Sequence, residues 1–174
     1  QILQLKNINF KLVSGKSLSE LKIAYKTFGK LNKNKTNAVL ICHALTGDQY
    51  VAGKNPITNK DGWWSRMVGS NKPIDTDEFF VICSNVLGGC AGSTGPKETD
   101  PNTNKSYERN FPSVTIKDMV KVQLYLIDSL KIDKLFSVIG GSMGAMQALQ
   151  WSIDYPNRVE TIIHIAGALK HSAQ

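Results

Sequence analysis

Residues 140–144 have the sequence GGSMG, which fits the pattern G-x-S-x-G and centres on Ser142. A short apolar run precedes this string and an apolar stretch follows it, so Ser142 is expected at a tight turn between a strand and a helix. Side chains at the flanking glycine positions would clash in such a turn, and the serine is held in a strained conformation with its hydroxyl exposed. The free N–H groups of the following helix would stabilise a negative tetrahedral intermediate. The string therefore predicts a serine nucleophile for acyl chemistry.

Other interpretations of the glycine-rich strings are weaker. A turn of small residues could merely let a strand and a helix pack closely. A dinucleotide-binding loop would need a glycine at the position of Ser142. Cys90, within GGCAGSTGP, is a competing nucleophile, but no helix follows it and no base is evident. We interpret Cys90 as part of a loop that lines the pocket, with its small thiol packed inside.

Stabilisation of an oxyanion normally uses two backbone N–H groups. One belongs to the residue after the nucleophile, here Met143, and the other to the loop after an earlier strand. The sequence CHALTGD leaves an apolar run at 38–44, so Leu45 or Ala44 is expected to supply the second donor. His43 could be taken for a catalytic base, but it precedes the serine, whereas this kind of site has the chain order Ser, then Asp or Glu, then His.

Two acids and two histidines follow the serine: Asp154, Glu160, His164 and His171. Asp154 ends the predicted helix, about 15 Å from the active end, and is expected at the surface. His164 lies inside an apolar run and is interpreted as a core histidine, while His171 is among the last residues. We expect none of the four to complete a catalytic triad with Ser142.

The elements that must position these residues have an α/β pattern. Four near-continuous apolar runs are typical of parallel strands covered on both faces. They are residues 38–45, 79–86, 135–140 and 161–167. Helical spacing over 116–130 predicts a first helix, with Thr115 and Asp118 as its N-terminal cap. A second helix is expected to begin at Met143 and to stop before Pro156. Strand–helix–strand alternation predicts a mostly parallel sheet with right-handed crossovers.

Two further segments have different patterns. Residues 8–15 and 21–29 alternate apolar and polar side chains, which predicts a half-buried antiparallel pair at a sheet edge. Residues 87–112 show no periodicity and are rich in Gly, Pro, Asn and Thr. A loop of this length that leaves the carboxyl end of a strand is expected to be functional.

Composition limits the function classes. The 174 residues are 41% hydrophobic and 20% charged, which is typical of a soluble globular domain, and no apolar run approaches the ~20 residues that span a bilayer. The net charge of +7 comes from scattered lysines, so we expect no nucleic-acid or membrane surface, at most a weak attraction for a phosphate-bearing cosubstrate. Three cysteines without CxxC spacing favour reduced thiols in the cytoplasm over a disulfide framework or a zinc site.

Several stretches resemble the homoserine O-acetyltransferases, acyltransferases of methionine biosynthesis with an α/β-hydrolase fold. They include ICHALTGDQYVAG, SNVLGGCAGSTGP and VIGGSMGAMQALQW, and they run in the family's order from about residue 20 onward. The resemblance implies a mostly parallel sheet with helices on both faces. It implies a ping-pong reaction in which Ser142 takes an acetyl group from acetyl-CoA and passes it to the hydroxyl of L-homoserine.

The same resemblance assigns the oxyanion N–H groups to Leu45 and Met143. It also implies small-molecule substrates, acetyl-CoA as a cosubstrate with no bound cofactor or metal, and a cytoplasmic homodimer. The sequence departs from the family at Ala145, where a second glycine is usual, and at Ser70 and Asn71, where a Gly-Pro-Gly-Lys pattern is usual. We expect both departures to be tolerated.

The family's lid, substrate-binding arginine, triad aspartate and triad histidine would lie beyond residue 174. The chain also lacks an initiator Met, so residues 1–174 are interpreted as the N-terminal part of a single α/β-hydrolase domain. Without a histidine base, a serine hydroxyl is a poor nucleophile at neutral pH. We therefore expect little transferase activity from these residues alone, together with an exposed sheet edge and poor solubility.

Three alternatives stay open at this point. The same fold could hydrolyse an ester or thioester, because fold does not decide whether water or another acceptor reaches an acyl-serine. Within acyl transfer, the donor could be succinyl-CoA and the acceptor could be serine. A non-enzymatic nucleotide-binding domain is disfavoured because neither G-x-G-x-x-G nor a Walker A motif is present.

Overall fold

The main sheet of the computed structural model, which describes residues 1–170, has six strands in the order β1-β4-β8-β5-β11-β12. Their bounds are β1 Ile2–Leu5, β4 Leu21–Phe28, β8 Phe80–Ser84, β5 Ala38–Cys42, β11 Leu135–Gly141 and β12 Val159–Ile165. Strands β8, β5, β11 and β12 are parallel, and β4 and β1 continue the sheet in antiparallel pairs. The predicted mostly parallel α/β sheet is confirmed.

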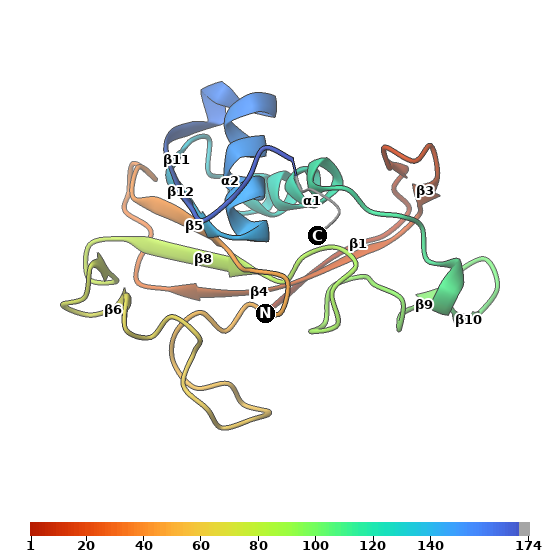
Figure 1. Cartoon of the computed structure of the whole chain (residues 1–174), viewed down its shortest axis with the longest axis horizontal. Helices are drawn as coiled ribbons and strands as arrows, with labels where there is room; N and C mark the ends of the chain where they lie inside the picture. Colours follow the sequence, from red (N-terminus) through yellow and green to blue (C-terminus); the bar gives the residue numbers. More distant parts are fainter. Residues whose placement is uncertain (171–174) are drawn as a thin grey trace.

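Both predicted helices form, as α1 Ile116–Ser129 and α2 Met143–Asp154. They pack together on one side of the sheet (Figure 1), over a core that includes Leu40, Val138 and the fully buried Trp151. The other side of the sheet carries a second apolar cluster, and the segment at 51–79 covers it with Val51 and Val68. Within the described residues, helices thus cover one face of the parallel strands and a long loop covers the other, whereas the resemblance implied helices on both faces.

The N-terminus of α1 has the predicted cap. Thr115 and Asp118 form a reciprocal capping box, in which each side chain accepts a hydrogen bond from the other residue's backbone N–H. Asp118 is buried, and its second carboxylate oxygen accepts a bond of 2.9 Å from the Val13 N–H. One carboxylate therefore begins the helix and also ties it to the N-terminal segment.

The expected antiparallel pair at the start of the chain was partly wrong. Strand β4 forms as predicted, but it pairs with β1 and β8 and so lies one strand in from the edge. Residues 8–15 instead contribute β2 Phe10–Lys11 to a small hairpin with β3 Ser17–Leu18. Gly15, at a φ of 84°, lies in the turn between them, and Phe10 is buried against Tyr125 of α1. The alternation does mark a segment with one buried side, but that side packs against helix α1 and not within the main sheet.

The expectation that all four apolar runs are covered on both faces was wrong for β12. This strand ends the sheet of the described residues, and Ile163 and Ile165 are 48% and 41% exposed. His164, interpreted as a core histidine, is likewise exposed. An apolar run alone does not reveal which strand of a sheet is outermost.

The remaining elements are short. They are the pair β6 Val68–Gly69 and β7 Ile74–Asp75, the hairpin β9 Thr99–Asp100 and β10 Lys105–Ser106, and the 3-10 turns η1 Glu108–Asn110 and η2 Pro156–Arg158. The predicted long loop at 87–112 therefore holds only β9, β10 and η1. Neither α1 nor α2 is long and apolar enough to cross a bilayer.

Asp118→Ala should lower the free energy of unfolding by about 2–3 kcal/mol, because it removes the cap and leaves the Val13 N–H without its partner. Chemical denaturation of the protein and the variant measures the loss. Asp133→Ala is the control: this side chain is exposed and should change stability by no more than about 0.5 kcal/mol. Equal effects of the two substitutions would contradict the role given to Asp118.

Candidate active site

Ser142 lies between the end of β11 and the first residue of α2, as the string predicts. Its backbone has φ 55° and ψ −120°, a conformation that residues with a side chain rarely adopt. The Ser142 N–H donates to the Ile165 carbonyl over 3.0 Å, which fixes the turn against β12. The residue is exposed, and its side chain makes no capping bond to α2. The hydroxyl is therefore presented at the carboxyl end of the sheet by a strained turn.

Two glycines permit this turn by close backbone contact. A Cβ atom on Gly140 would lie 2.0 Å from the Gly144 carbonyl oxygen, and one on Gly144 would lie 2.0 Å from the Cys42 carbonyl oxygen. Gly141 differs, because the nearest atom to its added Cβ would be the Ile165 oxygen at 4.0 Å. The turn therefore needs glycine at positions 140 and 144, the first and last of GGSMG, and has room for a methyl group at 141.

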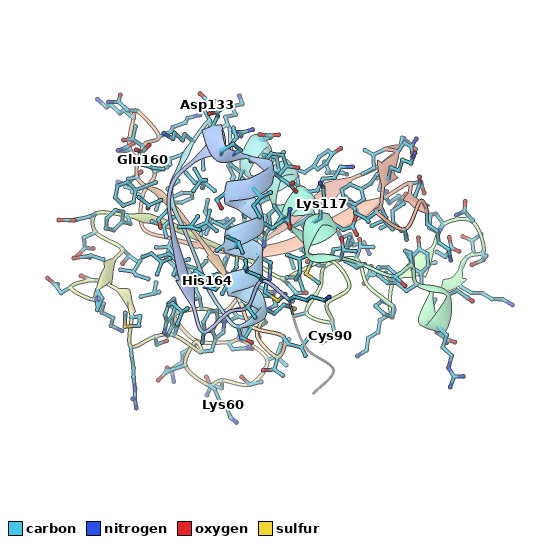
Figure 2. The ribbon with its side chains drawn as sticks, turned by 45° about the horizontal axis from the view of Figure 1, so that its top comes forward. Lys60, Cys90, Lys117, Asp133, Glu160 and His164 are labelled. Atoms are coloured by element: carbon cyan, nitrogen blue, oxygen red, sulfur yellow. The ribbon has the colours of Figure 1, made fainter. Side chains whose placement is uncertain are left out.

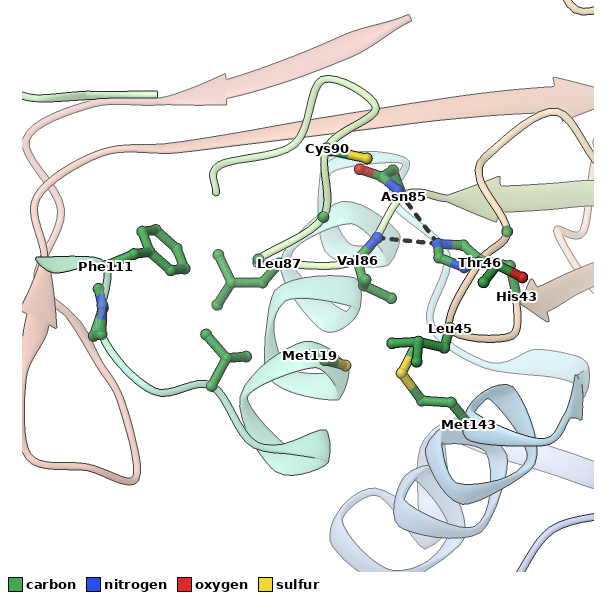
Figure 3. Close-up of a pocket in the computed structure, with 15 residues that line it drawn as sticks. His43, Leu45, Thr46, Asn85, Val86, Leu87, Cys90, Phe111, Met119 and Met143 are labelled. Atoms are coloured by element: carbon green, nitrogen blue, oxygen red, sulfur yellow. Dashed lines mark hydrogen bonds between the residues drawn. The ribbon is translucent and has the colours of Figure 1, made fainter. Parts of the chain in front are cut away.

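Leu45 and Met143 lie at one end of a pocket of about 430 Å³ (Figure 3). Met143 is the first residue of α2, so its N–H has no acceptor within the helix. The Leu45 N–H has no hydrogen-bond acceptor among residues 1–170. Both residues expected to supply oxyanion donors thus have an unused N–H and share one pocket, which begins where β5 and β8 end.

The wall of the pocket is mainly apolar. Val86 and Leu87 come from the loop after β8, Phe111 precedes α1 and Met119 lies on α1. Cys90 also lines the pocket, as predicted, but the expectation that its thiol is packed inside was wrong, because the residue is exposed. The loop at 87–112 therefore borders the site at the carboxyl ends of the strands, where it was expected.

The other two thiols are buried in neighbouring strands. Burial raises the pKa of Cys42 to about 12 and raises the pKa of Cys83 well above its ordinary value. Both stay neutral thiols at physiological pH and are poor nucleophiles. All three cysteines are free in the structure. In the described part of the chain, no group of His, Cys, Asp and Glu side chains is arranged to hold a metal ion.

His43 is almost fully buried beside the pocket, and burial lowers its pKa. Its Nδ1 atom lies 2.7 Å from the Ala44 carbonyl oxygen, and its Nε2 atom lies 3.3 Å from Val86 N and 3.4 Å from Asn85 Nδ2. Both ring nitrogens are therefore occupied by other groups. This geometry agrees with the sequence argument that His43 is not the base for Ser142.

None of the later acids and histidines within residues 1–170 is placed to serve Ser142. Asp154 ends α2, about 18 Å along the helix axis, where it is half-buried and pairs with Lys117 at 3.3 Å. Glu160 lies at the start of β12 and pairs with Lys134, at the opposite end of the strand from the site. Figure 2 shows it near Asp133 and away from Cys90.

His164 is exposed on β12, one residue before the Ile165 carbonyl that receives the Ser142 N–H. The structure gives its side chain no hydrogen bond to Ser142. His171 lies outside the described residues.

A buried polar network behind the site was not predicted from the sequence. Gln123 Oε1 accepts a bond of 2.8 Å from Trp151 Nε1, and Gln123 Nε2 donates to Gln147 Oε1 over 2.7 Å. Gln147 in turn donates to the Met143 carbonyl over 3.4 Å. The network joins α1 to the first turn of α2. A glutamine among the apolar positions of a helix was the available signal, because a buried amide needs partners.

The departures at 70 and 71 lie in the turn between β6 and β7. Asn71 has a φ of 55°, a left-handed conformation that asparagine adopts more readily than most residues, and its N–H donates to Asp75. Ser70 donates to Asp77. Ala145 is buried in α2. Each departure is accommodated without a contact to the Ser142 side chain.

Comparison with known proteins assigns the chain to a family. The family model for the alpha/beta hydrolase fold matches residues 37–173. The chain belongs to the α/β-hydrolase family. The turn at Ser142, between β11 and α2, has the strand–turn–helix context in which proteins of this fold carry their nucleophile.

Within this family, the chain is similar to curated proteins that share one name. The chain is 57% identical over 164 residues to homoserine O-acetyltransferase of Rhodospirillum rubrum, covering 94% of this chain and 42% of that protein. It is 54% identical over 168 residues to the protein of the same name from Caulobacter vibrioides, covering 97% of this chain and 44% of that protein. The chain thus spans less than half the length of these relatives.

Solved structures carry two different names. A homoserine O-acetyltransferase from Bacillus anthracis superposes with a TM-score of 0.91 at 31% identity, over 99% of this chain and 48% of that one. Esterase E22 superposes with a TM-score of 0.90 at 38% identity, over 99% of this chain and 49% of that one. The fold is common to both, so the likeness to solved structures does not separate transfer from hydrolysis.

Gly144→Ala should destabilise the protein by about 3 kcal/mol, because the added methyl group meets the Cys42 carbonyl and α2 must move away from β5. Gly141→Ala is the matched control and should stay within about 1 kcal/mol of the unchanged protein, since its methyl group meets no atom nearer than the Ile165 oxygen at 4.0 Å. Thermal or denaturant unfolding measures both. A tolerated alanine at 144 would show that the contact is not required.

Ser142→Gly should make the protein more stable than Ser142→Ala by about 1 kcal/mol, because glycine adopts a positive φ without strain and alanine does not. The two variants share the loss of the hydroxyl, so differential scanning calorimetry isolates the backbone effect. Equal melting temperatures would argue that the turn stores no strain.

Proposed function

We propose that this chain is the N-terminal part of an enzyme that transfers an acetyl group from acetyl-CoA to the hydroxyl of L-homoserine, in methionine biosynthesis. The identity of 54–58% to proteins named homoserine O-acetyltransferase carries the proposal. The strained and exposed serine supports it, because it supplies the nucleophile that acyl transfer needs.

In the proposed reaction, Ser142 Oγ attacks the thioester carbonyl and the carbonyl oxygen becomes an oxyanion. The backbone N–H groups of Leu45 and Met143 donate to that oxyanion. Collapse of the tetrahedral intermediate expels CoA as the thiol and leaves acetyl-Ser142. The homoserine hydroxyl then attacks the acetyl group and releases the serine. Acetyl-CoA is consumed as a cosubstrate, and the proposal includes no metal and no bound cofactor.

The reaction also needs a base for the Ser142 proton, and we propose that an aspartate and a histidine beyond residue 174 provide it. Within residues 1–170, ion pairs hold Asp154 and Glu160 away from Ser142, and the exposed His164 side chain makes no hydrogen bond to it. Residues 1–174 would then be one part of a single α/β-hydrolase domain. We further propose that the whole enzyme is a cytoplasmic homodimer acting on small molecules.

The pocket favours an acetyl donor over a succinyl donor. A succinyl group carries a carboxylate, and a buried charge in a protein is usually paired with an opposite charge. No lysine or arginine is among the residues of 1–170 that line the pocket. Met119, Leu45 and Val86 instead offer apolar contacts that suit a methyl group.

Hydrolysis of an ester is a second candidate function, and a specific likeness to a solved structure favours it. Over the 49% of its chain that aligns with this one, esterase E22 is 38% identical, and it superposes with a TM-score of 0.90. Both reactions pass through an acyl-serine, and they differ only in whether water or an acceptor hydroxyl attacks it.

With the whole protein, CoA release from acetyl-CoA should depend on added L-homoserine, and Ser142→Ala should reduce it by at least about 1,000-fold. Absorbance of the released thiol and mass spectrometry of the acetylated product measure the reaction. Release of p-nitrophenol from p-nitrophenyl acetate without any effect of homoserine would favour the esterase instead. Residues 1–174 by themselves should show little transfer, because a serine without its base reacts slowly.

A further inference from the structure

The Ala44 carbonyl, at the carboxyl end of β5, is held by two hydrogen bonds. His43 Nδ1 lies 2.7 Å from its oxygen, and the Gly47 N–H donates to the same oxygen over 2.9 Å. The peptide bond between Ala44 and Leu45 is trans, so its C=O and N–H groups point in opposite directions. The Leu45 N–H therefore points away from the His43 ring.

The partners of the ring define which nitrogen carries its proton. The Val86 N–H can only donate, so His43 Nε2 must accept from it, and the Asn85 amide donates to the same atom (Figure 3). The proton then resides on Nδ1, where the Ala44 carbonyl can only accept. Burial lowers the pKa of His43, which keeps the ring in this neutral form. The ring is thus a fixed donor aimed at one carbonyl.

The contact between β5 and α2 brings the residues at the end of β5 close to the first turn of α2, which follows Ser142. A Cβ atom on Gly144 would meet the carbonyl oxygens of Cys42 at 2.0 Å and of His43 at 3.1 Å, so the first turn of α2 abuts the end of β5. Leu45 follows two residues after His43 and lines the same pocket as Met143. The orientation of the Ala44–Leu45 peptide therefore decides whether the Leu45 N–H is available in that pocket.

We propose that His43 is a positioning residue, whose Nδ1–H holds the Ala44 carbonyl and thereby turns the Leu45 N–H toward the oxyanion of the acyl-transfer intermediate. The catalytic part of this statement rests on the proposed function, while the orientation of the peptide does not. The competing explanation is that His43 only anchors the loop after β8, through Nε2. The two explanations assign the effect to different nitrogens of one ring.

Two substitutions in the whole protein separate the nitrogens. His43→Asn can place an amide N–H near the Nδ1 position and keeps a donor for the Ala44 carbonyl. His43→Gln can place an amide oxygen near the Nε2 position and keeps the acceptor for Val86. If His43 positions the peptide, the Gln variant should lose about 100- to 1,000-fold in kcat with little change in KM, as when an oxyanion donor is removed. The Asn variant should retain most of kcat. The opposite order would overturn the proposal.

Crystal structures of the same variants test the orientation without any assay. A rotated Ala44–Leu45 peptide in the Gln variant, and an unchanged one in the Asn variant, would support the proposal. An unchanged peptide in both would overturn it, even if the unsubstituted protein forms no acyl-serine and the proposed function fails. Nitrogen-15 spectra of the unsubstituted protein add a test that needs no folded variant: the ring should carry its proton on Nδ1, and a proton on Nε2 would contradict the mechanism.

Discussion

The backbone contact between the start of α2 and the end of β5 is the constraint on which the site depends. Gly144 leaves no space for a side chain against the Cys42 carbonyl, and Gly140 leaves none against the Gly144 carbonyl. Because the helix begins so close to the sheet, the single residue that joins β11 to α2 is forced to a φ of 55°. The exposed Ser142 hydroxyl and the unused N–H groups beside it are consequences of the same contact.

Buried polar side chains hold the surroundings of that contact in one arrangement. Gln123 and Gln147 tie α1 to the first turn of α2, and His43 ties the loop after β5 to the loop after β8. A buried amide or imidazole that loses its partner costs about 1–3 kcal/mol, so alternative positions of these elements are disfavoured. The two walls of the pocket are therefore rigid where the N–H groups of Leu45 and Met143 lie.

Features encoded by adjacent residues could be predicted from the sequence. The turn at Ser142 and the cap at Thr115 depend on a few neighbouring side chains and backbone angles, and both form as expected. Features that depend on distant partners could not. The partner of β4 was assigned to residues 8–15 instead of β1, and His164 was taken for a core residue although β12 ends the described sheet. Periodicity reports that a segment has an apolar side, but not which segment covers it.

The described residues supply some of the groups that the proposed reaction needs, and other groups must come from elsewhere in the enzyme. The proposed nucleophile, the two proposed N–H donors and the apolar wall of the pocket all come from residues between β5 and the end of α2. They would stabilise the same tetrahedral intermediate for any acyl group that fits. The proton transfer and the choice between water and a hydroxyl acceptor require groups that contact the acyl-serine from its open side. A homoserine O-acetyltransferase and an esterase can therefore share this half with TM-scores of 0.91 and 0.90 and still differ in reaction. Specificity for the acceptor must arise where the pocket is completed, because the turn presents the same acyl-serine in either case.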